Sequence, residues 1–517
     1  MDNVSLTLCS RNRMEFEVLG LRTGAMAAIE QGQPTMIIER QAPIASTLQT
    51  SDHAYLTGPW TPQSEEFNVA ELEVIEGAVP VDLDGVYLRN TQNQLHQPLG
   101  FYHPFDGDGM VHQIDFQAGK ASYRNRFVRT AGFAAERDAQ ASLWGGIVDS
   151  PMLSQRPGFG FTKALKDSSN TDIVVHAGKA ISLFYMCGEG YRMDPLTLET
   201  LGAEGWVPPE GVSAHAKLNE ATGELYFFNY SAQEPYLHYG VVNKDNQLTA
   251  YRPVPLPGPR VVHDIAFSDN WAIVNDFPLM FGPGGAIMIR DQASRFGLVP
   301  RDGSDGEVRW FEAAPTFVEH WVNAYEEGDE VILDGYFQID PLPPAPPQYP
   351  ANVASMFSMI DCVAMGTRLQ RWRFNLIDGT TREEILDERT NVEFGMFDQR
   401  LAGKKYRYAY SATMAPGMFL MDGWVKHDLQ SGQQTPYKLP DGLYCSESPF
   451  APRVGSTAED DGYLVSFIID QNTDTSECWI LDARNIEAGP VARLQLPQKI
   501  CSGTHACWAG RSQLAAA

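Results

Sequence analysis

Short apolar segments recur along the chain from Tyr55 onward, and Gly, Asp, Asn and Pro separate them. They are rich in Val, Ile, Tyr and Phe, the residues that favour extended strands. Clear examples are residues 85–88, 173–176, 224–228, 271–274 and 462–467. Short strands of this kind at regular spacing predict an all-β protein with a closed architecture.

Two stretches interrupt this pattern. Residues 336–350, YFQIDPLPPAPPQYP, contain six prolines, so we expect neither a central strand nor a helix there but a long loop over the ring. Residues 353–369 carry methionines and small apolar residues, which either form a lid or fill the core of a loop. Residues 1–50 show no sustained period, and we expect a poorly ordered N-terminal extension.

Composition narrows the class of protein. The 517 residues are 43% hydrophobic and carry a net charge of −26, which supports a large core and argues against a nucleic-acid partner. The seven cysteines are scattered and include no CxxC, as expected of reduced thiols. No apolar run approaches the length of about 18 residues that a membrane span needs, and charged residues interrupt the N-terminus where a signal peptide would be apolar. We therefore expect a cytoplasmic protein.

Four histidines lie in similar settings, at strand edges far apart in the chain: His215, His263, His320 and His505. The first two intervals, 48 and 57 residues, each match about one propeller blade, and the third, 185 residues, matches about three or four. Histidines on the inner strands of a closed ring would meet on its axis. Four neutral imidazoles suit Fe(II), Cu or Zn, and the spacing does not decide among them.

Two glutamates stand in apolar surroundings where a solvated charge is not expected: Glu393 before Phe394, and Glu447 in SESPFAPR. A metal-bound histidine usually donates its other ring N–H to a carboxylate, so both are candidates for that contact. In HPFDGDGMVH, by contrast, we expect Gly107 and Gly109 to form a tight turn and His112 to be structural.

From about Tyr55 to Gly510 the chain resembles the carotenoid cleavage oxygenase family. The matching segments are YLRNTQN, HPFDGDGMVH, DPLTLETLG, AHAKLNEATGEL, VHDIAFSDNWAI, EHWVNAYEEG, SESPFAPR and THACW. The resemblance implies a seven-bladed β-propeller with a cap of loops and helices over its top face, formed by residues 51–517 as one catalytic domain. It also implies one Fe(II) on the axis, held by His215, His263, His320 and His505. Glu393 and Glu447 match two of three outer carboxylates of the family, and Met186 stands where the third is expected.

The implied activity is the oxidative cleavage of a conjugated C=C bond with O2 to give two carbonyl products, without an organic cofactor. Phe105, Ile147 and Tyr185 are the expected lining of the substrate tunnel. Ile147 and Tyr185 stand where members that cleave phenolic stilbenes or phenylpropenes carry Tyr and Lys. A carotenoid or apocarotenoid is therefore the favoured substrate, and a lignostilbene- or isoeugenol-type phenol is the alternative.

The remaining expectations concern partners. An apolar substrate and O2 would be the ligands, and the protein would contact a membrane surface transiently to take up that substrate. A propeller that binds a lipid or a partner without chemistry is a competing interpretation, which rests on Met186 alone.

Overall fold

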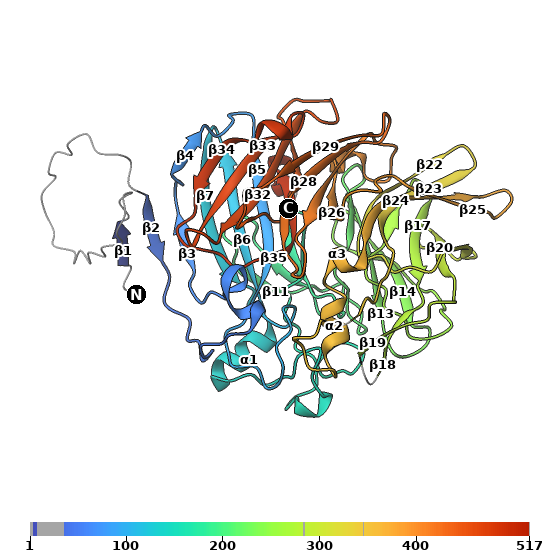
Figure 1. Ribbon diagram of the computed structural model, residues 1–517, viewed down its shortest axis with the longest axis horizontal. Helices are drawn as coiled ribbons and strands as arrows, with labels where there is room; N and C mark the ends of the chain where they lie inside the picture. The colour runs from blue at the N-terminus through green and yellow to red at the C-terminus, as the bar shows by residue number, and fades with distance from the viewer. Residues whose placement is uncertain (1–3, 8–35, 283–284, 345, 516–517) are drawn as a thin grey trace, which may run out of the picture.

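Seven antiparallel sheets are arranged as the blades of a β-propeller in the computed structural model, which describes residues 4–7, 36–282, 285–344 and 346–515 (Figure 1). The first sheet comprises β1 (Val4–Thr7), β2 (Ile37–Arg40), β3 (Phe67–Val69), β7 (Lys120–Phe127), β6 (Asp108–Gln117), β5 (Gly85–Asn93) and β35 (Gly503–Gly510). The second comprises β8 (Asp172–His176), β9 (Lys179–Leu183), β10 (Tyr191–Met193) and β11 (Thr200–Ala203). The third comprises β12 (Lys217–Asn219), β13 (Glu224–Tyr230), β14 (Leu237–Val242) and β15 (Leu248–Pro253). The fourth comprises β16 (Ala266–Phe267), β17 (Trp271–Asp276), β20 (Ser294–Pro300) and β21 (Arg309–Ala313), with a separate hairpin of β18 (Leu279–Gly282) and β19 (Gly285–Met288).

The remaining three sheets complete the ring. The fifth comprises β22 (Trp321–Glu327), β23 (Glu330–Gln338), β24 (Thr367–Asn375) and β25 (Thr381–Ile385). The sixth comprises β26 (Val392–Met396), β27 (Tyr408–Met414), β28 (Met421–Asp428) and β29 (Gln433–Lys438). The seventh comprises β30 (Leu443–Tyr444), β31 (Phe450–Pro452), β32 (Gly462–Asp470), β33 (Thr475–Asp482), β34 (Pro490–Gln495) and β4 (Val74–Gly77). The all-β, seven-bladed expectation is confirmed.

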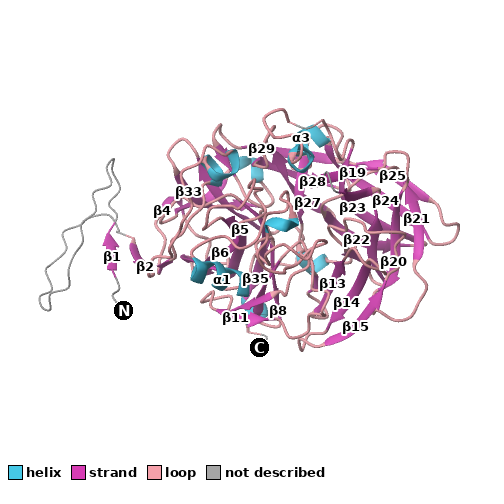
Figure 2. Ribbon diagram, turned by 90° about the horizontal axis from the view of Figure 1, so that it is seen from below, coloured by secondary structure: helices cyan, strands magenta, loops and turns pink. Residues whose placement is uncertain are grey.

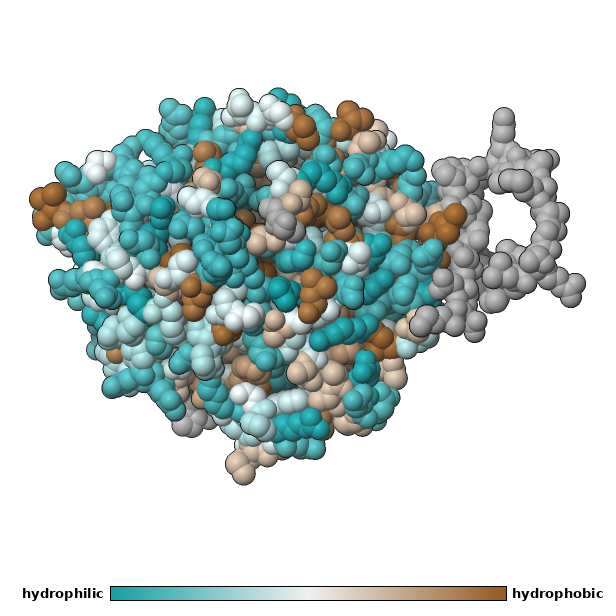
Figure 3. All heavy atoms as spheres, turned by 180° about the vertical axis from the view of Figure 1, so that it is seen from behind, coloured by the Kyte–Doolittle hydropathy of each residue, from teal (hydrophilic) through white to brown (hydrophobic). Residues whose placement is uncertain are grey.

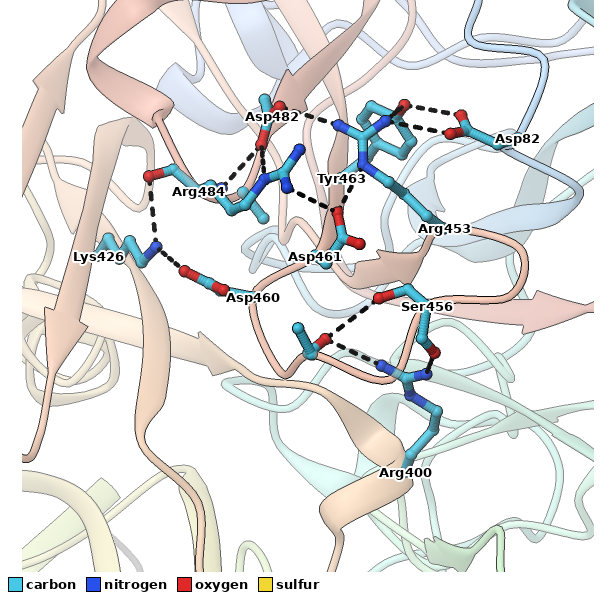
Figure 4. Close-up of polar contacts among 12 residues, drawn as sticks. Asp82, Arg400, Lys426, Arg453, Ser456, Asp460, Asp461, Tyr463, Asp482 and Arg484 are labelled. Atoms are coloured by element: carbon cyan, nitrogen blue, oxygen red, sulfur yellow. Dashed lines mark hydrogen bonds and ion pairs between the residues drawn. The ribbon is translucent and has the colours of Figure 1, made fainter.

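Both ends of the propeller chain close the ring. The C-terminal strand β35 pairs with β5 of the first blade, and the early strand β4 pairs with β34 of the last. Arg453 adds a polar link between these parts (Figure 4). Its guanidinium lies 3.2 Å from Asp82, which follows β4, 2.9 Å from Asp482 at the end of β33, and 2.8 Å from Asp461. Two strand exchanges and this ion-pair cluster hold the first and last blades together.

The strands inside the blades are buried on both faces, because each blade packs between two others. Val331, Ile332 and Leu333 in β23 are fully buried, as their uninterrupted apolar run predicts. The turn before them is confirmed as well, since Gly328 has a φ of +61°, in the left-handed region that glycine enters at little cost.

The proline-rich stretch begins later than its sequence suggests. Tyr336–Gln338, which we expected in a loop, belong to the central strand β23 and pair with Leu369, Arg368 and Thr367 of β24. The first proline of the stretch is Pro341, so nothing in these three residues prevents ladder hydrogen bonds. Among the described residues, 339–350 contain no helix or strand.

Helices and loops gather over one side of the ring, as expected of a cap. α1 (Ala131–Ala139) and α2 (Ala354–Ser358) lie on the lower side in Figure 1, and Figure 2 looks onto that side. α3 (Cys362–Met365) follows, and α4 (Arg511–Leu514) ends the described chain. The short 3-10 helices are η1 (Ala54–Leu56), η2 (Gly58–Trp60), η3 (Pro151–Leu153), η4 (Gln399–Leu401) and η5 (Ile486–Ala488). Within the cap, Phe357, Ile360, Met356 and Met359 all belong to core clusters, and the last three also line a cavity, so this segment serves both roles that its composition left open.

A buried ion triad connects the cap to the first blade. Lys166 Nζ lies 2.9 Å from Asp108 Oδ1 in β6 and 2.6 Å from Glu136 Oε2 in α1. Burial alone lowers the pKa of Lys166, but the two carboxylates outweigh it and raise that pKa above its ordinary value. Lys166 therefore stays charged and anchors a buried polar segment, residues 166–172, that leads to the propeller axis.

In HPFDGDGMVH the close backbone approach expected at the glycines is present, but the turn precedes them: the Asp106 N–H donates to the His103 carbonyl at 3.0 Å, and Gly109 lies within β6. A Cβ on Gly107 would lie 2.8 Å from the backbone nitrogen of Asn93, and one on Gly109 would lie 2.1 Å from the carbonyl oxygen of Ser169. Both positions therefore require glycine. His112 is fully buried, and its Nδ1 lies 2.8 Å from the Tyr123 hydroxyl, which fits the structural role expected for it.

Residues 36–50, which the sequence places in the N-terminal extension, include β2, and β2 pairs with β3 of the first blade. Residues 1–3 and 8–35 lie outside the described residues. The six cysteines in the described part of the chain are free thiols. Within that part no helix has the length and hydropathy to cross a membrane. The face seen in Figure 3 is mostly hydrophilic, in keeping with the strong negative charge.

Candidate metal centre

Four histidines from four different blades meet on the propeller axis. His215, His263 and His320 stand just before the inner strands β12, β16 and β22, and His505 lies within β35. Their rings form a closed, folded cluster, in which the centroid of His215 is 4.7 Å from that of His263, 4.5 Å from that of His505 and 5.0 Å from that of His320. The centroid of His320 completes it at 5.2 Å from His263 and 4.7 Å from His505.

Two carboxylates orient two of these rings. His320 Nδ1 lies 2.6 Å from Glu393 Oε2, and His505 Nδ1 lies 3.2 Å from Glu447 Oε2. Burial and the neighbouring Glu319 raise the pKa of Glu393. When the carboxylates accept from Nδ1, each ring keeps the Nε2 lone pair for a metal. The structure thus brings both predicted glutamates to the histidines.

The free nitrogens point to a metal ion. Nε2 of His215 and Nε2 of His320 are buried and have no hydrogen-bond partner among the described residues. One ring nitrogen each from His215, His320 and His505 lie within 4.8 Å of one another. Burial lowers the pKa of His215 and His320 well below the ordinary value and that of His263 to about 3, so these rings are neutral at pH 7. Burial also opposes protonation of His505, but Glu447 outweighs it and raises the pKa of His505. Converging imidazoles, two of them with a buried and unpartnered Nε2, fit a divalent first-row metal.

Two residues of the centre, Phe394 and His215, have an unusual backbone conformation that helps to position its side chains. Glu393 begins a bulge in β26, where the pairing with β27 shifts, and Phe394 there has a φ of +53°. That bulge turns Glu393 toward His320 and sets the Phe394 ring 4.7 Å from the His320 ring. His215 has a φ of +67°, and its N–H donates to Asp172 Oδ2 at 2.8 Å. Non-glycine residues in the left-handed region are sparse, and two of the twelve in the described chain, His215 and Phe394, lie at this centre.

Sequence reasoning missed two aspartates that support the centre. Asp172 holds the backbone of His215, and Asp264, which follows His263 directly, accepts the N–H of Trp321 at 2.9 Å. Asp264 Oδ1 also lies 2.7 Å from Lys217 Nζ. The sequence gave a signal for Asp264, because it directly follows the candidate ligand His263. It gave no signal for Asp172, which is 43 residues from His215.

An apolar cavity of about 50 Å³ adjoins the histidines on the cap side. Phe105, Ile147 and Tyr185, the expected tunnel residues, all line it, so the structure places them together. His263 and Met186 line it as well. The Tyr230 hydroxyl contacts Met186 Sδ at 3.6 Å, so a thioether occupies this place beside His263, and no described carboxylate hydrogen-bonds to the His263 ring.

Two other features frame the centre. A cavity of about 390 Å³ with a mixed polar and apolar wall also reaches His215, His320 and His505 and is lined in part by Lys217 and Arg400. The acidic pair after His320 lies away from both cavities, because Glu326 binds Ser268 and Asn270 and Glu327 pairs with Lys405.

Glu319, the residue directly before His320, is the one carboxylate that lines the apolar cavity among the described residues. It is 9% exposed, and burial raises its pKa to about 8 against a smaller opposing effect of His505. Sequence reasoning passed over it, although a charged residue between the apolar pairs Phe317-Val318 and Trp321-Val322 was a visible signal.

The fold and the four-histidine centre define a class of propeller oxygenases, and comparison with known proteins gives the family. The RPE65 family model, described as retinal pigment epithelial membrane protein, matches residues 60–510. The chain is 31% identical over 505 residues to the carotenoid 9,10(9',10')-cleavage dioxygenase 1 of Pisum sativum, covering 89% of this chain and 91% of that protein. The chain therefore belongs to the RPE65 and carotenoid cleavage oxygenase family, and the resemblance in its sequence is confirmed.

Solved structures agree with this assignment. The Pseudomonas brassicacearum lignostilbene dioxygenase matches with a TM-score of 0.78 and 25% identity, over 90% of this chain and 100% of that one. A variant of the Synechocystis apocarotenoid oxygenase matches with a TM-score of 0.77 and 26% identity, over 87% of this chain and 98% of that one. A cobalt-substituted form of that oxygenase is also known. These relatives are oxygenases with different substrates.

Replacing Glu393 or Glu447 by Gln is expected to lower activity about 10–100-fold, the usual cost of losing a partner that orients a metal-binding histidine. The amide keeps the shape but removes the negative charge that the histidine N–H faces. Initial rates and metal affinity, measured by competition with a chelator, check this expectation.

Glu327→Gln is the matched control, because Glu327 is half-exposed on β22 and pairs with Lys405 away from the centre. If Glu393→Gln and Glu447→Gln behave like this control in both measurements, the two glutamates do not orient metal ligands.

Proposed function

We propose that this protein is a non-haem iron(II) dioxygenase that oxidatively cleaves a conjugated C=C bond of a carotenoid or apocarotenoid with O2 to give two carbonyl products. The observation that carries the proposal is the juxtaposition of four converging histidines with an apolar cavity. Family membership and the named activities of the relatives support it.

His215, His263, His320 and His505 would hold the iron. When bound, Fe(II) supplies the redox chemistry that lets O2 react with an alkene, which closed-shell side chains cannot provide. Glu393 and Glu447 hold the protons on Nδ1 of His320 and His505 and so keep Nε2 directed to the metal. Phe105 and Phe394 exclude water from the cavity next to the rings.

The cavity must widen to admit a polyene. Its volume of about 50 Å³ is far below the roughly 300–1,000 Å³ of typical ligand pockets. Met356, Met359 and Ile360 from the cap form part of its wall, and unbranched methionines rearrange readily. We infer that these side chains withdraw when substrate enters. Burying a long polyene then gains about 25 cal/mol per Å² of apolar surface, with few polar contacts needed.

The alternative is cleavage of a phenolic stilbene or phenylpropene by the same iron centre. The lignostilbene dioxygenase among the structural relatives favours it, and so does the Tyr185 hydroxyl, which lines the cavity. Against it, Ile147 offers no hydrogen bond to a phenol, and no lysine lines the cavity among the described residues.

We expect a carotenoid or apocarotenal to be cleaved faster than a hydroxystilbene or an isoeugenol-type phenol at equal concentration. The reason is the wall of the cavity, which is apolar and aromatic over most of its surface. Product analysis by chromatography and mass spectrometry measures the ranking, and labelled O2 should appear in a carbonyl product. Efficient cleavage of the phenol with none of the polyene would establish the alternative instead.

A further inference from the structure

Glu319 is a buried carboxylate without a partner. It lies in the loop between β21 and β22, is 9% exposed, and takes part in no hydrogen bond or ion pair with the described residues. An ionised carboxylate in such surroundings costs several kcal/mol unless a cation or hydrogen-bond donors compensate it. The described lining of the apolar cavity contains neither lysine nor arginine, so the protein itself supplies no cation there.

The position of Glu319 is between the substrate cavity and the histidines. It lines the apolar cavity and also a smaller one, of about 20 Å³, which is bounded by His263, His320 and His505 together with Thr171 and Phe394. This smaller cavity touches three of the four histidine rings on the cap side. A side chain placed there faces the side of the centre from which substrate approaches.

Glu319 also lies close to His320 and Glu393. An oxygen of Glu319, a ring nitrogen of His320 and an oxygen of Glu393 all lie within 4.8 Å of one another. Glu393 is already engaged by His320 Nδ1 at 2.6 Å, so Glu319 is the carboxylate of this group that remains free. With metal–ligand bonds of about 2.0–2.2 Å, two donors on one ion stand up to about 4.4 Å apart, so Glu319 must turn away from Glu393 toward the smaller cavity that it lines to join the nitrogens of His215, His320 and His505 on one ion.

We propose that Glu319 is a fifth protein ligand of the metal, which binds on the cap side beside His320. This inference rests on the proposed function, because an apolar substrate offers the carboxylate no partner and the metal is then the only cation available to it. As a ligand, Glu319 would bring a negative charge directly to the ion, whereas Glu393 and Glu447 act on it only through His320 and His505. In an octahedral ion, five protein donors leave one position for a small molecule.

Cobalt(II) is a suitable probe, since its visible absorption depends on the number and type of ligands. Metal-free wild-type protein, Glu319→Gln and the control Glu327→Gln would be titrated with Co(II) in competition with a chelator, without substrate. We expect Glu319→Gln to bind Co(II) at least about tenfold more weakly and to show an altered visible spectrum, whereas Glu327→Gln matches wild type. Thermal unfolding of the three metal-free proteins shows whether each is folded.

Glu319→Leu separates metal binding from substrate contact. If Glu319 binds the metal, this variant loses Co(II) affinity like Glu319→Gln. Unchanged Co(II) affinity and an unchanged spectrum in both variants would overturn the proposal, and tighter polyene binding by Glu319→Leu would then assign the residue to the substrate wall. Failure of wild-type protein to bind Co(II) at all would instead contradict the proposed function, so the two failures are distinguishable.

Discussion

Replacing His320 by Ala is expected to remove the metal from the protein and to lower oxygenase activity by more than about 100-fold. Loss of a carboxylate that only orients a metal-binding histidine usually lowers metal affinity or activity about 10–100-fold, and loss of the histidine itself should cost more. His320 is central to the site, because its ring contacts the rings of His263, His505 and Phe394 and its Nδ1 binds Glu393. The same loss is expected for His215→Ala, His263→Ala and His505→Ala.

His238→Ala is the matched control for these variants. The His238 ring stacks on Tyr251, and its Nδ1 lies 3.2 Å from Asn229 Oδ1 on the third blade, outside both cavities that reach the centre. It should keep full metal content. If all four centre variants keep their metal and activity as His238→Ala does, the four histidines are not the ligands.

Replacing Lys166 by Met is expected to lower the free energy of unfolding by about 3–5 kcal/mol, the usual cost of removing one partner from a buried ion group. Lys166, Asp108 and Glu136 are 8%, 3% and 3% exposed, so water cannot take over the role of the ammonium. The methionine fills much the same volume and leaves two buried carboxylates uncompensated. Urea unfolding followed by tryptophan fluorescence measures the change.

The control is Lys404→Met, which removes an ion pair between Lys404 and Asp269, both about half-exposed. Exposed pairs contribute about 0–1 kcal/mol, so this variant should unfold close to wild type. Equal losses in the two variants would mean that burial of the Lys166 triad adds nothing to its contribution.

The fold was predictable because blade strands are short, regular and buried on both faces. The apolar runs at residues 85–88, 224–228 and 462–467 fall within β5, β13 and β32. The prediction from the proline-rich stretch was wrong at Tyr336–Gln338, which belong to β23. Prolines exclude a central strand only at their own positions, and these three residues precede the first proline. That Ile37–Arg40 belong to the first blade depends on pairing with β3, a contact about 30 residues away in the sequence.

The parts of the candidate site that could be predicted from the sequence are the histidines that can bind a metal and the carboxylates that can orient them. His215, His263, His320 and His505, with Glu393 and Glu447, follow from ligand chemistry and the resemblance, and the structure brings them together. Asp172 and the bulge at Phe394 were not predictable, since they depend on how two inner strands align across the axis. Glu319 was visible in the sequence, but only its position between two cavities gives it a meaning.

Metal analysis of the purified protein by inductively coupled plasma mass spectrometry tests the central claim, that four histidines on the propeller axis hold a catalytic iron. We expect about one iron per chain, lost in His320→Ala and retained in His238→Ala, with activity proportional to iron content. Stoichiometric zinc in place of iron, or full activity in protein freed of iron, would contradict it.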